Sequence, residues 1–84
     1  MERVSVNRHE LRVQRVSANG RIEEKVFNPF WTRFEVDRHK EIGITSMRLV
    51  NRDTNVQIGS FLNPKDRESF ALAFSNALGR AKQA

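Results

Sequence analysis

The sequence predicts an α+β domain in which an antiparallel sheet of six to seven strands, or a split barrel, is packed by one C-terminal helix. Three observations lead to this prediction. Upstream of Gly59, apolar residues alternate with polar ones as in half-buried strands. From Asn63 onward, they recur as on one face of a helix. The connections between the strand segments are short, whereas parallel neighbours would need crossovers of about a dozen residues or more.

Length and composition limit what the chain can be. Its 84 residues allow one domain, residues 1–84, around one small core. The absence of cysteine excludes disulfides and thiolate metal sites and suits a reducing cytosol. No apolar run approaches the length of about 18 to 20 residues that spans a bilayer, so the chain as given is expected to be soluble. The net charge of +5 favours acidic partners, although acids and bases are interspersed.

Strands are predicted across roughly residues 3–62, and the first hairpin lies at the N-terminus. Val4 and Val6 alternate with polar residues before a polar turn at residues 7–10, and Leu11 and Val13 resume the alternation. This pattern is typical of two antiparallel strands with one buried face.

The Asn19-Gly20 dipeptide is the strongest turn signal in the chain. Both central residues of a two-residue type I′ turn need positive φ, which Asn and Gly tolerate best. Counting outward from such a turn places Val13 opposite Val26 and Arg15 opposite Glu24. We expect the latter pair to be exposed and to fix the register of the hairpin without forming an active site.

Further strands follow the interruption at Asn28-Pro29. One strand begins near Thr32, a second runs from Ile44 or Thr45 to Val50, and a third follows the polar turn at residues 51–55. The residues expected to face the core in these three strands are Thr32, Phe34, Val36, Met47, Leu49, Val56, Ile58 and Phe61.

A helix is predicted over roughly residues 64–82. Asn63 can cap it, and Pro64 suits its first position, where a missing N–H costs nothing. Leu72 falls on the polar side and is either a lone exposed leucine or a contact point for a partner. The apolar stripe expected to pack on the sheet consists of Phe70, Ala73, Phe74, Ala77, Leu78 and Ala81.

No motif indicates catalysis or metal binding. His9 and His39 lie in polar turns far apart in the sequence, and no Gly-x-Ser-x-Gly elbow or phosphate-binding glycine loop is present. We therefore predict a protein that is not an enzyme, with no cofactor, no metal and no small-molecule substrate.

Nucleic-acid binding is the alternative that the basic composition leaves open. Arginines could contact phosphates, and aromatic side chains could stack on bases. However, Phe27, Phe30 and Trp31 flank Pro29 and are expected to plug the end of the small barrel. Nucleic acid is therefore a less favoured partner than a protein or an anionic membrane.

Several segments resemble a known family. These are the strand Arg12–Val16, the Asn19-Gly20 turn, Phe-Asn-Pro-Phe-Trp-Thr-Arg at residues 27–33, and Gly-Ser-Phe-Leu-Asn-Pro-Lys-Asp-Arg at residues 59–67. From Leu11 to Ala81 the chain resembles the soluble C-terminal part of the bacterial integral membrane proteins known as domain of unknown function 2244. The predicted architecture also resembles the pleckstrin-homology-like fold, which hosts many functions.

The resemblance implies a small domain excised from a longer protein, at the cytoplasmic face of the bacterial inner membrane. The membrane helices of the parent protein would then lie just upstream of Glu2. Arg3 and Arg8 would fall near the bilayer surface, where basic residues remain on the cytoplasmic side.

The candidate binding site consists of these two arginines and the corner formed by Asn28, Pro29, Trp31 and Arg33. Proline breaks strand pairing, Asn can bond the exposed backbone, and Trp offers a large amphipathic ring. The corner is either a docking surface or a purely structural turn. We expect an interaction domain whose partner is an unknown protein or an anionic membrane surface.

Overall fold

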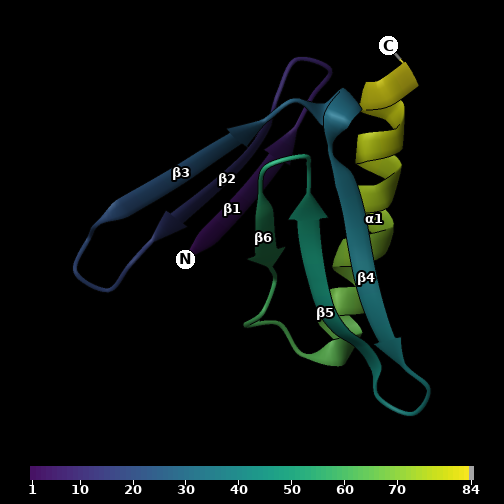
Figure 1. Cartoon of the computed structure of the whole chain (residues 1–84). Helices are drawn as coiled ribbons and strands as arrows, with labels where there is room; N and C mark the ends of the chain where they lie inside the picture. Colours follow the sequence, from purple (N-terminus) through teal and green to yellow (C-terminus); the bar gives the residue numbers. More distant parts are fainter. Residues whose placement is uncertain (84) are drawn as a thin grey trace.

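The structure, a computed structural model, describes residues 1–83 and places six strands before one long helix (Figure 1). The described residues thus confirm the α+β class, the antiparallel strands and the C-terminal position of the helix. The elements in chain order are β1 (Glu2–Val6), β2 (Leu11–Val16), β3 (Ile22–Phe27), the 3-10 turn η1 (Pro29–Trp31), β4 (Arg33–His39), β5 (Gly43–Val50), β6 (Asn55–Ile58) and α1 (Pro64–Gln83).

The strands form two three-stranded antiparallel sheets, ordered β1-β2-β3 and β4-β5-β6. The break falls at Asn28-Pro29, where the 3-10 turn redirects the chain and prevents β4 from pairing with β3. The sequence predicted this interruption, but the predicted single sheet of six to seven strands is not found within residues 1–83, whose strands form two sheets instead.

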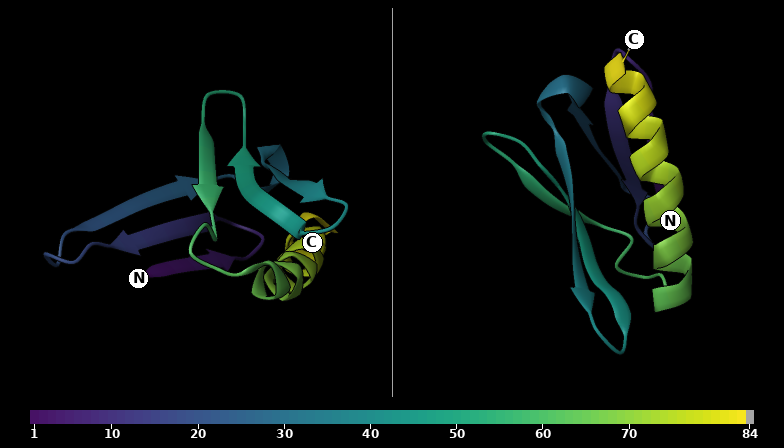
Figure 2. Two further views of the ribbon diagram at one scale, coloured as in Figure 1. Left: turned by 90° about the horizontal axis from the view of Figure 1, so that it is seen from below. Right: turned by 90° about the vertical axis from the view of Figure 1, so that its right-hand side faces the viewer.

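The two sheets and the helix share one core. Figure 2 shows α1 and the β1-β2-β3 sheet on the same side of the β4-β5-β6 sheet. Phe34 of β4 meets two helix rings edge-on, with ring centroids 6.5 Å from Phe70 and 4.9 Å from Phe74. The buried apolar core consists of Leu11, Val13, Phe27, Ile44, Met47, Leu49, Val56, Ile58, Ala71, Phe74, Leu78 and Ala81.

The register of the β2-β3 hairpin differs by one residue from the prediction. Val13 pairs with Lys25, and Arg15 pairs with Glu23. The cause is the turn: the Ser17 N–H donates to the Arg21 carbonyl at 2.9 Å, so the loop has three residues. Only its glycine, Gly20, adopts positive φ, at 82°, as in a type I turn followed by a glycine bulge. The predicted pairs Val13 with Val26 and Arg15 with Glu24 are therefore wrong.

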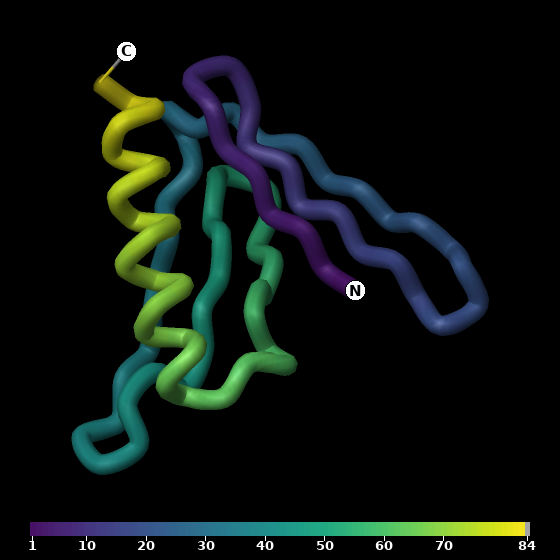
Figure 3. The backbone as a smooth tube through the Cα atoms, turned by 180° about the vertical axis from the view of Figure 1, so that it is seen from behind, coloured from purple at the N-terminus to yellow at the C-terminus, as the bar shows by residue number. Residues whose placement is uncertain are grey.

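The outer half of this hairpin extends beyond the core. Figures 1 and 3 show β2 and β3 projecting away from the helix and the second sheet. Phe27 is the only buried residue of β3, whereas Ile22 and Val26 are 62% and 54% exposed. The hairpin thus presents an uncovered strand at the edge of the first sheet.

The helix begins as predicted, because the Asp66 N–H donates to Asn63 Oδ1 at 2.8 Å. Its buried stripe differs from the prediction at two positions: Ala71 is buried and Ala73 is exposed. Leu72 is 67% exposed, in agreement with its predicted place on the polar side.

Phe61 was expected in the core but is 68% exposed. The reason is Gly59, whose φ of 67° ends the strand after Ile58 and turns the chain toward the helix. Phe61 therefore lies outside β6 and no longer follows its alternation.

Candidate functional site

The corner at residues 28–33 is built around a short 3-10 turn. The Asn28 side chain caps the turn by accepting from the Phe30 N–H at 3.0 Å. The Asn28 carbonyl accepts from Thr32 Oγ1 at 2.8 Å. Pro29 and Thr32 are fully buried, so Asn28 and Pro29 hold the turn against the core. Their role in this structure is to shape the corner.

The two aromatic residues between Pro29 and Thr32 point outward. Phe30 is 48% exposed and Trp31 is 76% exposed. In a 3-10 turn, residues i and i+3 lie on one side, so burying Pro29 and Thr32 leaves the intervening residues on the other. The prediction that these aromatics plug the end of the fold is correct for Phe27, which is buried, and wrong for Phe30 and Trp31.

Basic side chains lie at the same end of the molecule as this exposed pair. Figure 1 shows the β1-β2 turn, η1 and the C-terminal end of α1 at the same end of the molecule. Arg8 and Arg80 line one groove of about 310 Å3, and Trp31 and Arg52 line a second hollow of about 470 Å3. Lys82 Nζ donates to the Thr32 carbonyl at 2.9 Å. We call this surface the basic-aromatic end, which comprises Arg8, Phe30, Trp31, Arg52, Arg80 and Lys82.

The charges of the basic-aromatic end are largely uncompensated. Within residues 1–83, none of its four basic side chains forms an ion pair with a carboxylate. Asp53 is an exposed acid next to Arg52 in the β5-β6 turn. Glu10 of the neighbouring β1-β2 turn is already paired, at 2.8 Å, with Arg12. An anion approaching this end would therefore meet mostly positive charge.

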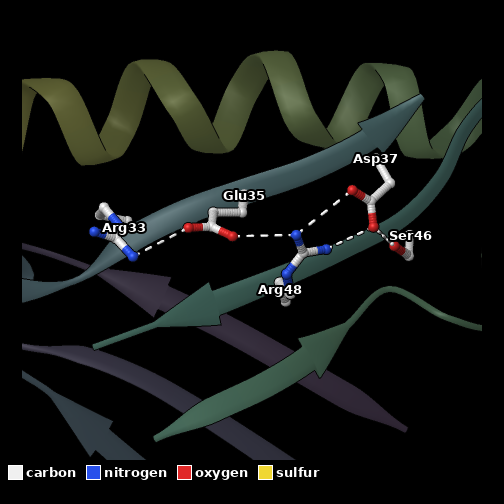
Figure 4. Close-up of polar contacts among 5 residues, drawn as sticks. All are labelled: Arg33, Glu35, Asp37, Ser46 and Arg48. Carbon is white, nitrogen blue, oxygen red and sulfur yellow. Dashed lines mark hydrogen bonds and ion pairs between the residues drawn. The ribbon is translucent and has the colours of Figure 1, made fainter. Parts of the chain in front are cut away.

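Arg33 belongs to a different cluster. On the outer face of the second sheet it pairs with Glu35 at 3.2 Å, and Glu35 pairs with Arg48 at 3.1 Å (Figure 4). Arg48 also pairs with Asp37 at 2.7 Å, and Asp37 accepts from Ser46 Oγ at 2.8 Å.

The hydrogen bond from Arg48, supported by that from Ser46, lowers the pKa of the Asp37 carboxyl below its ordinary value of 3.8. The same pairing with Asp37 raises the pKa of Arg48. Alternating charges across paired strands stabilise their register, so this cluster is explained by the fold and leaves Arg33 engaged.

The two N-terminal arginines are separated by the structure. Arg8 lies in the β1-β2 turn and joins the basic-aromatic end. Arg3 lies on β1 opposite Gln14, away from the turn. The predicted site therefore divides into a structural pair, Asn28 and Pro29, and an exposed part to which Trp31 and Arg8 belong.

Sequence reasoning missed three basic residues of this end: Arg52, Arg80 and Lys82. The last two lie in the final turn of α1, where basic residues suit the negative end of the helix dipole and need no other explanation. Arg52 lies in a turn between strands, where charge is ordinary. Their place at the same end of the molecule as Trp31 depends on how the helix and the second sheet pack, and no local sequence signal reports that packing.

Comparison with known proteins places the chain in a family. No curated protein and no solved structure matches it. Among the described residues, no helix is both long enough and apolar enough to cross a membrane. The model of a family described as "Integral membrane protein (DUF2244)" matches residues 1–78. This match confirms the resemblance found in the sequence, and the chain belongs to the DUF2244 family of integral membrane proteins.

Proposed function

We propose that this domain is a non-enzymatic interaction module that rests its basic-aromatic end on anionic lipid headgroups at the cytoplasmic face of the bacterial inner membrane. In this proposal the chain is the soluble C-terminal part of a longer membrane protein. The observation that carries it is an exposed tryptophan, Trp31, at the same end of the molecule as four basic side chains that have no carboxylate partner within residues 1–83.

The chemistry of this end suits the region between water and lipid. Tryptophan concentrates at membrane interfaces, because its ring is apolar while its N–H can bond to headgroups. A basic residue near an anionic surface contributes about 1 kcal/mol of attraction. The basic-aromatic end provides both features, because four basic residues and two exposed aromatic rings lie at one end of the molecule. The pleckstrin-homology-like architecture, which remains a prediction, would be compatible with a lipid-facing role.

Trp31 is the only tryptophan in the chain and therefore reports directly on docking. We expect its fluorescence to shift to shorter wavelength when vesicles containing phosphatidylglycerol are added, because the ring leaves water. Neutral phosphatidylcholine vesicles should produce no shift, and high salt should weaken the anionic response. No shift with anionic vesicles would contradict the proposal.

Matched double variants test whether the position of the charge matters. Arg8→Gln with Arg80→Gln removes two charges from the basic-aromatic end, and Lys40→Gln with Lys65→Gln removes two exposed charges elsewhere. The first pair should lose about 2 kcal/mol of binding, roughly thirtyfold in partitioning. The control pair should bind nearly as the wild type. Equal losses would indicate a general effect of net charge and would reject the assigned surface.

Trp31→Ala separates docking from a structural role. Because the ring is 76% exposed, truncation should change the melting temperature by only a few degrees. Vesicle co-sedimentation of this variant should be clearly reduced. A large loss of stability with unchanged co-sedimentation would instead identify a purely structural corner.

The same fluorescence titration distinguishes a membrane partner from nucleic acid and from a protein partner. A short DNA duplex and a single-stranded RNA should leave Trp31 fluorescence unchanged. A salt-sensitive response to these, with none to anionic vesicles, would favour the nucleic-acid alternative. Silence toward all probes would direct the search to a protein partner.

A further inference from the structure

We infer that the free edge of β3 pairs with β3 of a second copy of this chain, in antiparallel orientation and centred on Glu24. The inference is independent of the proposed membrane role. It depends on three features of the projecting hairpin: its unpaired backbone, its exposed apolar residues, and the order of its charges.

The backbone of β3 has unpaired groups along one side. Ser17 bonds through its N–H to Arg21, so residues 21, 23, 25 and 27 direct their N–H and C=O groups toward β2. The pairing of Val16 with Met1 on the other side of β2 agrees with this alternation. Ile22, Glu24 and Val26 therefore direct theirs outward. β3 is the last strand of its sheet, and the strand from Ile22 to Val26 is exposed.

The side chains along this edge are self-complementary. With Glu24 on the twofold axis, Ile22 faces Val26 of the second copy, and Glu23 faces Lys25 of the second copy. This register also sets outward-directed backbone groups opposite one another, as an antiparallel ladder requires. Apolar and oppositely charged cross-strand pairs each stabilise a sheet, and the pairing would cover two apolar residues that are now more than half exposed.

Glu24 would lie opposite the same residue of the second copy. Its carboxylate already accepts from Gln14 Nε2 at 3.0 Å and lies 3.8 Å from Arg12 Nε. These neighbours on β2 partly compensate the repulsion across the axis. Sliding one strand by two residues relative to the other moves the twofold axis to Lys25 or to Glu23. Both registers are less favourable, because they set Lys25 against Lys25 or Glu23 against Glu23.

The interface would be small. One strand edge buries less surface than the roughly 1,200 Å2 of the smaller stable interfaces, so we expect a weak dimer. Sedimentation of the 84-residue chain from about 10 µM to 1 mM should show dimer formation in the upper part of this range. A chain that stays monomeric throughout would overturn the inference.

Charge exchange tests the register. Glu23→Lys and Lys25→Glu each place like charges across both symmetric pairs, and each should weaken self-association by about tenfold or more. An equimolar mixture of the two variants should restore dimers, because opposite charges then face each other. Glu41→Lys and Lys40→Glu, exposed residues of the β4-β5 turn, provide matched charge controls and should dimerise normally. Failure of the mixture to recover would overturn the inference.

Hydrogen exchange supplies an independent readout. At concentrations where dimers form, the amides of Ile22, Glu24 and Val26 should become protected, while those of Glu23 and Lys25 are protected at all concentrations through β2. Dimers without this alternation would place the interface elsewhere and overturn the assignment.

Antiparallel pairing directs the two basic-aromatic ends away from each other. The charge-exchange variants should therefore bind vesicles like wild type, so failure of either proposal can be recognised separately.

Discussion

The two three-stranded sheets have similar strands but differ in how much of each is covered. In the β4-β5-β6 sheet, the inward residues of β5 and β6 are almost completely buried under α1 and the first sheet. In the β1-β2-β3 sheet, the buried residues of β2 stop at Val13, and no residue of β3 before Phe27 is buried. Beyond Val13, the contacts to the second sheet are polar ones from Arg15 and Glu2. Alternation in a sequence therefore predicts a strand with two different faces, but not whether the apolar face is covered.

This comparison assigns different roles to the two sheets. The second sheet supplies five buried apolar residues against three from the first sheet, and we expect it to contribute more to stability. The first sheet contributes to the core near its turn at residues 7–10 and leaves the edge strand β3 available for contacts. The following predictions test this division, from the largest expected effect to the smallest.

The largest contrast is expected between truncations in the two sheets. Leu49→Ala removes a fully buried side chain from β5 and should cost about 2 to 5 kcal/mol in the free energy of unfolding. Val26→Ala on β3, where the residue is 54% exposed, should cost no more than about 0.5 kcal/mol in the monomer. Urea denaturation at low protein concentration measures both. Similar losses would show that the hairpin is as tightly packed as the second sheet.

A substitution at Gly59 should break the connection from β6 to the helix. Its φ of 67° strains any residue with a Cβ, and that Cβ would meet Cε of the buried Met47. Gly59→Ala should therefore cost about 1 to 3 kcal/mol. Gly79→Ala, on an open helical position, is the control and should stabilise by roughly 0.5 to 1 kcal/mol. Thermal unfolding of both variants tests this difference. An unchanged melting temperature for Gly59→Ala would contradict the strain assigned to this turn.

The junction between the two sheets depends on Glu2. Its side chain is 10% exposed and accepts from the Gly59 N–H at 2.9 Å and from Arg15 Nε at 2.8 Å. Arg15 also donates to the Gln57 carbonyl of β6. Glu2→Ala would leave the Gly59 N–H without its partner and should cost about 1 to 2 kcal/mol.

The exposed Glu41 provides the matched control, because Glu41→Ala removes a carboxylate that joins no ion pair within residues 1–83. It should leave the urea midpoint almost unchanged. If Glu2→Ala also left the urea midpoint unchanged, the ion pair between Glu2 and Arg15 would contribute nothing to holding the sheets together.

Most of the fold could be predicted because local chemistry determines it. The Asn63-Pro64 helix start, the alternation in β5 and the interruption at Asn28-Pro29 each act within a few residues. The register of β2-β3 was missed because Asn19-Gly20 is compatible with both a two-residue and a three-residue turn, and only the backbone distinguishes them. The division into two sheets was missed because it depends on tertiary packing.

The candidate site could be predicted only in part for the same reason. The corner around Trp31 was found, because a proline between aromatic residues is a local signal. The exposure of Trp31 was not predicted, because the burial of Pro29 and Thr32 beneath the turn determines which side chains point outward. Arg52 and Arg80 join the site from elements distant in the sequence. The candidate surface is thus a property of how η1, two strand turns and the end of α1 pack together.

The smallest effect concerns the charge cluster on the outer face of the second sheet. Arg48 and Ser46 lower the pKa of Asp37 in the folded protein below its ordinary value of 3.8. The folded state therefore binds fewer protons at this carboxyl than the unfolded state. Its contribution to stability is present above about pH 4 and is lost as pH falls through the folded pKa.

Urea unfolding from pH 6 down to pH 2.5 should show this in the difference between wild type and Asp37→Asn, which removes the titration. The difference should be largest at neutral pH and shrink below about pH 4, and added salt should reduce it because the pair is exposed. A difference that stays constant with pH would mean that Asp37 acts through hydrogen bonding alone. The outer face would then stabilise the register of β4 and β5 without a measurable contribution from charge.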